Sequence, residues 1–169
     1  YVKIIFDEIS DYGVATYKRI YADWTTPNSS SWKDVLLENS ITPIQQYGYT
    51  VGKNSTDAAM IIDAMDILYS GHVDGFCIAS SDSDFTKLAS RLRESGMFVV
   101  GMGEKKTPKP LIVACNQFKF LDILAQTDDT NNSSESSTDV AKEGSSLLYG
   151  GSSKLYESKK YSNTDSENG

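Results

Sequence analysis

Two aspartates, Asp82 and Asp84, follow directly after a short apolar run in the stretch GFCIASSDSDF, residues 75–85. The apolar run is typical of a buried strand, and the acids come where a helix begins. Carboxylates one residue apart repel each other, so keeping both ionised requires a cation, nearby hydrogen-bond donors or a helix N-terminus. The stretch also fits a simple helix N-cap with an acidic first turn, and taken alone it does not separate the two interpretations.

A third aspartate comes at an equivalent place in the chain. Asp57 lies in the first turn of an amphipathic helix predicted over 56–70, after a loop that follows the strand-like run 41–47. If the two strands are parallel, their carboxyl ends meet at one edge of a sheet, and Asp57 should lie near Asp82 and Asp84. Three such carboxylates favour a hard divalent cation, Mg²⁺ or Mn²⁺, which takes oxygen ligands and keeps water molecules to deliver to a phosphate.

Three other motifs overlap these residues. GYTVGKN, residues 48–54, is similar to a phosphate-binding loop, but its glycine spacing is one residue short and Asn54 replaces the magnesium-binding hydroxyl. DSD also begins an EF-hand loop, but residues 85–88 lack the third ligand and the glycine. DSDFT, residues 82–86, matches the D-x-D-x-T of haloacid-dehalogenase-type phosphatases, although few residues follow to supply their distant lysine and acidic pair. We reject the first two and keep the phosphatase as the weakest alternative.

Several residues near the predicted strand ends are candidates for substrate binding. Loop lysines can contact phosphates, although exposed lysines are more often only solvated. Trp24 could stack on a base or pack in the core, and Ser81 could hold a metal-bound water or only bond the turn backbone. The candidates are Lys53, Asn54, Ser81, Trp24, Lys105 and Lys106, with Lys109 in the same region.

The remaining titratable side chains give no second catalytic set. His72 is the sole histidine and is expected to face solvent, which makes a histidine-based acid–base mechanism a poor fit. Other acids, namely Glu38, Asp63 and Asp66, are expected on solvated helix faces.

The elements that must position these residues alternate along the chain. Helical periodicity occupies about 2–12, 31–39, 56–70, 84–95 and 109–116, and strand-like runs occupy about 14–21, 41–47, 74–79, 97–102 and 118–123. Gly13, Gly71 and Gly96 follow helical segments at positions typical of helix ends. This alternation predicts an α/β fold, a three-layer α/β/α sandwich with a mostly parallel sheet covered by helices on both faces.

Composition divides the chain into two parts. Residues 1–124 carry the periodic apolar pattern and are expected to form one domain. From about residue 125, Ser, Asn, Thr, Gly and charged residues dominate, so residues 125–169 are expected to be a low-complexity tail or linker, with SLLYGG at 146–151 docking at most locally.

Charge and hydropathy exclude several classes of protein. No apolar run approaches the ~18 residues of a membrane span, and two cysteines are too few for a disulfide framework, so we expect a cytoplasmic protein with no membrane partner. The formal net charge of −7 argues against a nucleic-acid binder with a broad basic face. It is compatible with an enzyme whose bound cations meet the phosphates.

Four separated stretches resemble the LabA-like branch of the NYN domains, which are PIN-like, metal-dependent ribonucleases. They are YADWTTPN at 21–28, WKDVLLENSITPIQQYGYTVGKNSTDAAMIIDAMDILYSG at 32–71, DGFCIASSDSDFTKLASRLRESG at 74–96 and GMGEKKTPKP at 101–110. The resemblance covers roughly 1–124 and implies a PIN-like fold in which Mg²⁺ or Mn²⁺ activates water to cleave RNA. It also implies that Asp57, Asp82 and Asp84 are the metal ligands and catalytic acids.

One part of the family pattern has no counterpart in this sequence. The family's first strand ends in an aspartate of a D-x-x-N motif, whereas residue 1 already lies in the helix expected after that strand. Asp7 lies on the polar face of that helix and does not replace the missing acid. We therefore expect a metal-dependent ribonuclease with impaired activity in this chain. The alternative is a non-catalytic NYN module that binds RNA or a protein, and an unpaired sheet edge could favour a homodimer.

Overall fold

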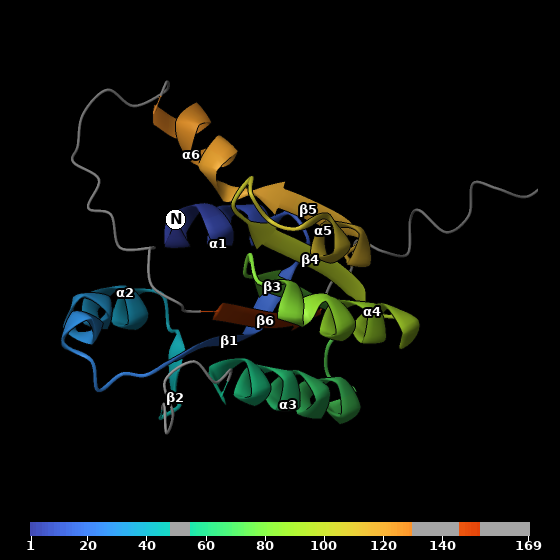
Figure 1. Cartoon of the computed structure of the whole chain (residues 1–169), viewed down its shortest axis with the longest axis horizontal. Helices are drawn as coiled ribbons and strands as arrows, with labels where there is room; N and C mark the ends of the chain where they lie inside the picture. Colours follow the sequence, from blue (N-terminus) through green and yellow to red (C-terminus); the bar gives the residue numbers. More distant parts are fainter. Residues whose placement is uncertain (48–54, 130–145, 153–169) are drawn as a thin grey trace, which may run out of the picture.

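The computed structural model describes residues 1–47, 55–129 and 146–152, and its helices and strands alternate as the sequence predicts (Figure 1). The elements are α1 (Val2–Ser10), β1 (Val14–Ala22), η1 (Pro27–Trp32), α2 (Lys33–Glu38), β2 (Thr42–Gln45), α3 (Ser55–Ser70), β3 (Gly75–Ala79), η2 (Ser83–Phe85), α4 (Thr86–Glu94), β4 (Phe98–Gly103), α5 (Lys109–Ala114), β5 (Gln117–Phe120), α6 (Leu121–Asp129) and β6 (Ser146–Ser152).

The strands form one sheet in the order β2-β1-β6-β3-β4-β5. Strand β1 is parallel to β2, and β3, β4 and β5 are parallel to one another. Strand β6 is antiparallel to both of its neighbours, β1 and β3, so those two run in the same direction. The carboxyl ends of five strands therefore meet at one edge of the sheet, as a mostly parallel sheet requires.

Each face of the sheet packs against its own set of helices. Alternate residues of β3 enter different cores: Phe76 and Ile78 pack with α3, α4 and α5, whereas Cys77 and Ala79 pack with α1 and α2. This period of two is the pleat of a strand that is buried on both sides. Figure 1 shows α3 and α4 on one side of the sheet and α1 and α6 on the other. The predicted three-layer α/β/α fold is confirmed.

The helix ends also follow the sequence pattern. Gly71 and Gly96 end α3 and α4 with φ angles of +72° and +85°, a conformation that residues with a Cβ atom rarely adopt. On α1, Ile5 and Ile9 are buried against the sheet and Asp7 is exposed, as its apolar stripe predicts.

The prediction that residues 125–169 form a tail or linker is wrong for Ser146–Ser152. Ser146–Ser152 form β6, which lies between β1 and β3, and Leu148 is fully buried in the core beneath α3 and α4. Two neighbouring strands offer β6 their N–H and C=O groups, and buried backbone groups need such partners. The sequence indicates SLLYGG as an apolar segment within this stretch, but it predicts that SLLYGG docks at most locally, because the surrounding composition is polar. The rest of that stretch lies largely outside the described residues.

The last predicted strand is also shorter than expected. The sequence suggested a strand over about 118–123, but β5 ends at Phe120 and α6 begins at Leu121 and extends to Asp129, past the expected domain boundary at 124. The apolar residues Leu121, Ile123 and Leu124 are compatible with either element, because a short apolar run does not distinguish strand from helix.

No helix in the described part of the chain combines the length and apolar character needed to cross a membrane. Cys77 and Cys115 are both free and buried.

Candidate metal centre and its flanking loops

Asp57, Asp82 and Asp84 meet at the carboxyl edge of the sheet. One carboxylate oxygen from each residue lies within 4.8 Å of the other two. Asp57 comes from the first turn of α3, and the other two come from the loop and 3₁₀ turn between β3 and α4. Asp57 and Asp82, 25 positions apart in the sequence, thus belong to one acidic cluster, because β3 ends and α3 begins at the same edge.

The β3–α4 loop fixes the orientation of its two acids. The Asp82 carboxylate caps η2 by accepting a hydrogen bond of 2.9 Å from the Asp84 backbone N–H. Phe85 follows directly and is fully buried in the core. A buried ring beside two exposed acids anchors the loop and holds both carboxylates at the surface. The N-cap and the acidic cluster, which the sequence offered as alternatives, are therefore both present.

Asp57 differs from its partners because it is half-buried. Burial raises the pKa of the Asp57 carboxyl group, and the negative charges of Asp82 and Asp84 raise that pKa further. The N-terminal end of α3 favours a negative charge at this position. The cluster therefore holds repelling charges that a bound cation would neutralise.

The spacing of the three carboxylates fits a small divalent cation. When three oxygens all lie within 4.8 Å of one another, some point lies within about 2.8 Å of all three, slightly outside the 2.0–2.6 Å ligand distances of Mg²⁺ and Ca²⁺. Small side-chain rotations would close that difference. Carboxylate oxygen is also the ligand type that Mg²⁺ and Mn²⁺ prefer, so the donor set fits the expected metals.

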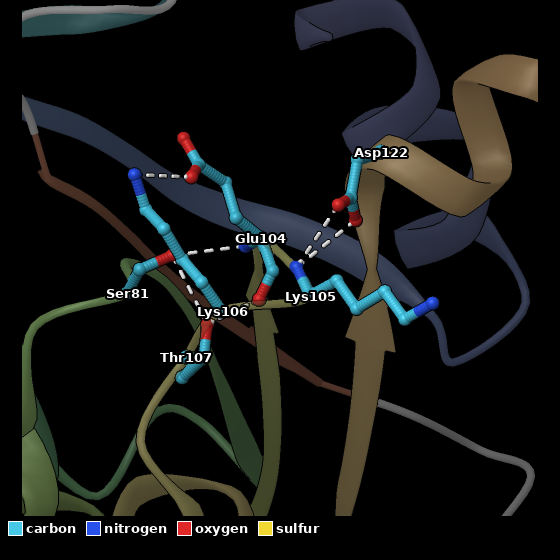
Figure 2. A network of polar contacts seen from close by, with 6 residues as sticks. All are labelled: Ser81, Glu104, Lys105, Lys106, Thr107 and Asp122. Carbon is cyan, nitrogen blue, oxygen red and sulfur yellow. Dashed lines mark hydrogen bonds and ion pairs between the residues drawn. The ribbon is translucent and has the colours of Figure 1, made fainter.

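The turn between β4 and α5 lies beside the acidic loop. Figure 2 shows Ser81 of that loop joined by hydrogen bonds to Glu104 and Thr107 of the turn. The Ser81 Oγ accepts a bond of 2.9 Å from the Glu104 N–H, and it lies 3.1 Å from the Thr107 Oγ1. On the other side of the turn, the Lys105 N–H donates to both carboxylate oxygens of Asp122, at 3.1 Å each. Ser81 was predicted either to hold a metal-bound water or to bond to turn backbone. Its contact with the Glu104 N–H corresponds to the second role.

The three candidate lysines of this region are exposed but differ in direction. The Lys106 ammonium group forms an ion pair of 2.7 Å with the Glu104 carboxylate. In Figure 2 the Lys105 side chain extends to the opposite side of the view from Ser81. Lys109 is the first residue of α5. In the same view the Lys106 ammonium group lies on the side of Ser81.

The other candidates for substrate binding have different outcomes. Lys53 and Asn54 lie outside the described residues. Trp24 is half-buried beside the Trp32 ring, with ring centroids 6.5 Å apart, and its indole N–H donates to the Ile44 carbonyl at 3.0 Å. This contact corresponds to the packing role that the sequence allowed for Trp24.

The prediction that Asp63 lies on a solvated helix face is wrong. Asp63 of α3 is half-buried, and its carboxylate accepts hydrogen bonds from the Arg19 guanidinium group and the Tyr21 hydroxyl of β1. Burial and the neighbouring Asp63 charge raise the pKa of Tyr21 well above its usual range. Periodicity places Asp63 at the margin of the apolar face, but it cannot show that a strand supplies two donors there. Asp66 and His72 are exposed, as expected.

Sequence reasoning missed Thr107 and Asp122, which hold the β4–α5 turn. Their types carry no chemical signal, because Thr and Asp are common in turns and at helix starts. The position of Thr107 gave a weak signal. It lies four residues after the end of β4, and β4 pairs with β3, the strand that leads into the acidic loop.

Comparison with known proteins identifies the family. The sequence model of the NYN domain matches residues 1–123. No curated protein matches this chain. Among solved structures, a protein of unknown function from Vibrio parahaemolyticus superposes with a TM-score of 0.51 at 20% identity, over 63% of this chain and 67% of its own. At that identity the likeness shows the fold alone. Because the family match extends over well more than half of the sequence, this chain belongs to the NYN domain family.

Proposed function

We propose that this protein is a metal-dependent endoribonuclease of the LabA-like branch, with Asp57, Asp82 and Asp84 as its metal ligands. The single observation that carries the proposal is the convergence of these three carboxylates at the carboxyl edge of the sheet, within 4.8 Å. Membership of the NYN family, which is generally nuclease-like, supports phosphodiester hydrolysis as the chemistry.

The chain's own residues would divide the work at this site. A bound Mg²⁺ or Mn²⁺ supplies a water of lowered pKa and stabilises negative charge on the phosphate. Asp82, oriented by the Asp84 N–H, would hold the cation together with Asp84 and the half-buried Asp57. Lysines of the β4–α5 turn would attract the phosphate backbone of RNA to a protein whose overall charge repels it.

The proposal is tested with purified protein and a fluorescently labelled single-stranded RNA. We expect cleavage that requires Mn²⁺ or Mg²⁺, stops with EDTA, and falls at least about 100-fold in Asp84→Asn, because that variant loses a charged ligand. Asp66→Asn is the matched control, because Asp66 is an exposed acid further along α3. Cleavage that survives EDTA, or equal rates in both variants, would contradict the proposal.

A second candidate function is a domain that binds RNA or a protein without cutting. The observation that favours it lies between β1 and β3, where the family resemblance implies a strand that ends in an aspartate. Here β6 runs in the opposite direction and presents Ser146 and Leu147 opposite Tyr21 and Ala79 at that edge. Metal-dependent RNA binding without turnover would support this alternative.

The phosphatase alternative lacks support from the family match. It requires Asp82 to be a nucleophile, and a covalent phosphoryl group on Asp82 would be its signature. We place the proposed reaction in the cytoplasm, where a reducing medium suits two free, buried cysteines.

A further inference from the structure

Thr107 is a buried polar residue, with 5% of its surface exposed. Buried hydroxyl groups need hydrogen-bond partners, so its contacts show what this turn is built to hold. The Thr107 Oγ1 donates to the Glu104 carbonyl at 2.6 Å, and the Thr107 N–H donates to the same carbonyl at 2.9 Å. Thr107 thus closes the turn of residues 104–107, which we name the basic turn.

The hydrogen bonds of Thr107 and Ser81 form a closed ring. A threonine hydroxyl has one hydrogen, and the 2.6 Å bond to the Glu104 carbonyl uses it. The 3.1 Å bond between the two hydroxyls must then take the hydrogen of Ser81. Ser81 in turn accepts from the Glu104 N–H. The ring runs from Glu104 N–H to Ser81, to Thr107 and back to the Glu104 carbonyl, and it uses every hydroxyl hydrogen available (Figure 2).

The ring leaves the basic turn little freedom to shift. A Cβ atom on Gly103 would lie 2.8 Å from both the Ser81 Oγ and the Thr107 Oγ1, so no larger residue fits there. On the opposite side, Asp122 accepts two bonds from the Lys105 N–H. The backbone of the turn is thus held both by the loop that carries Asp82 and by the start of α6.

We propose that Thr107 is a positioning residue, which acts through Ser81 to hold the Lys106 side chain beside the metal-binding loop. The inference rests on the proposed function and deepens it, because it assigns the phosphate contact to Lys106 rather than to Lys105. Lys106 is 78% exposed and is paired only with a half-exposed Glu104, an ion pair that a phosphate group can displace at small cost.

The register of the turn decides which lysine faces the substrate. Lys105 and Lys106 are neighbours in sequence, and their side chains point to opposite sides in Figure 2. A turn that slipped or loosened would lose this distinction. Misplacement of a charged group by about 1 Å can cost up to about 100-fold in rate.

The experiment compares Thr107→Val, Thr107→Ser and Lys106→Ala, alone and combined, with Ser95→Ala as the control. Ser95 makes a similar hydroxyl bond at the far end of α4. Single-turnover cleavage of RNA in Mn²⁺ is measured together with Mn²⁺ affinity by calorimetry. We expect Thr107→Val and Lys106→Ala each to lower the rate about tenfold with Mn²⁺ affinity unchanged, and Thr107→Ser to restore it. The double variant should match Lys106→Ala alone, because both changes remove the same contact.

The outcomes separate this inference from the proposed function. Wild-type protein that does not cleave RNA overturns both. Cleavage by the wild type with an undiminished rate in Thr107→Val overturns the inference alone, as does a double variant whose losses multiply. If Thr107→Val does not fold, Ser81→Ala opens the same ring from its other side. Amide hydrogen exchange must then show faster exchange at Glu104 in a folded Ser81→Ala protein, and unchanged exchange overturns the inference.

Discussion

At the scale of single residues, ionised Asp57 lowers the free energy of unfolding when no metal is bound. Its carboxyl group is half-buried beside two other carboxylates, and these neighbours raise its pKa. A carboxyl group with a raised pKa binds protons more tightly in the folded state than in the unfolded state, so its ionisation lowers the free energy of unfolding as pH rises through that range.

Replacing Asp57 with asparagine should therefore stabilise the protein in the absence of metal. We expect a melting temperature about 1–3 °C higher at pH 7, a small gain because water screens this partly exposed group. The gain should shrink as pH falls towards the ordinary aspartate pKa of about 3.9, where the wild type is protonated too. Thermal unfolding in EDTA measures it. Mn²⁺ should raise the wild-type melting temperature and leave that of Asp57→Asn nearly unchanged; the same response in both proteins would contradict metal binding by Asp57.

At the scale of elements, two hydrogen bonds to Asp63 join helix α3 to strand β1. Asp63 accepts from Arg19 and from the buried Tyr21 hydroxyl. Asp63→Ala would leave both donors unsatisfied, so we expect a loss of about 2–3 kcal/mol in the free energy of unfolding, against about 1 kcal/mol for Tyr21→Phe. Urea unfolding measures both, with the exposed Asp66→Ala as control. A loss no larger than that of the control would show that the contact contributes nothing.

The sequence correctly predicted the helices and strands whose pattern is contained within their own residues. Helical periodicity, strand-like runs and glycines at helix ends located α1 to α5 and β1 to β4, and the acids followed because strand ends carry ligand sites in such sheets. The missed contacts join distant parts of the chain. Ser81 and Thr107 are 26 positions apart, and Asp63 and Tyr21 are 42 apart. Side-chain partners of this kind depend on the packing of elements, which one sequence does not encode locally.

The interior position of strand β6 is the largest difference from the sequence-based prediction. It leads to a testable prediction about the core. Leu148 is fully buried with residues of α3 and α4. Leu148→Ala should lower the free energy of unfolding by about 2–5 kcal/mol, through lost burial and the cavity that remains. Leu37→Ala is the matched control, because Leu37 of α2 is 69% exposed and should change stability by about 0.5 kcal/mol or less. Equal stability of the two variants would mean that β6 is not part of the core in solution.

The charge of the whole molecule predicts how RNA binding responds to salt. The formal net charge of −7 argues against a broad basic face, and the described lysines in and beside the β4–α5 turn are Lys105, Lys106 and Lys109. Phosphate contacts from at most these three lysines correspond to a slope no steeper than about −2 for log K against log [salt] with single-stranded RNA. Fluorescence anisotropy with a non-cleavable RNA at fixed Mn²⁺ measures this slope. A slope steeper than about −4 would reveal a basic surface that this proposal does not contain.

The position of β6 also determines when the sheet can form completely during protein synthesis. The sheet pairs Val14 with Ser152, and β1 and β3 share no hydrogen bonds except through β6. A nascent chain can form its helices and the β3–β4–β5 pairings early, but the two halves of the sheet join only after residue 152 has left the ribosome. Until then β1 and β3 each expose an unpaired edge, which can pair with another chain. Closure over so long a stretch is slow, so the yield of native protein on refolding should fall as protein concentration rises.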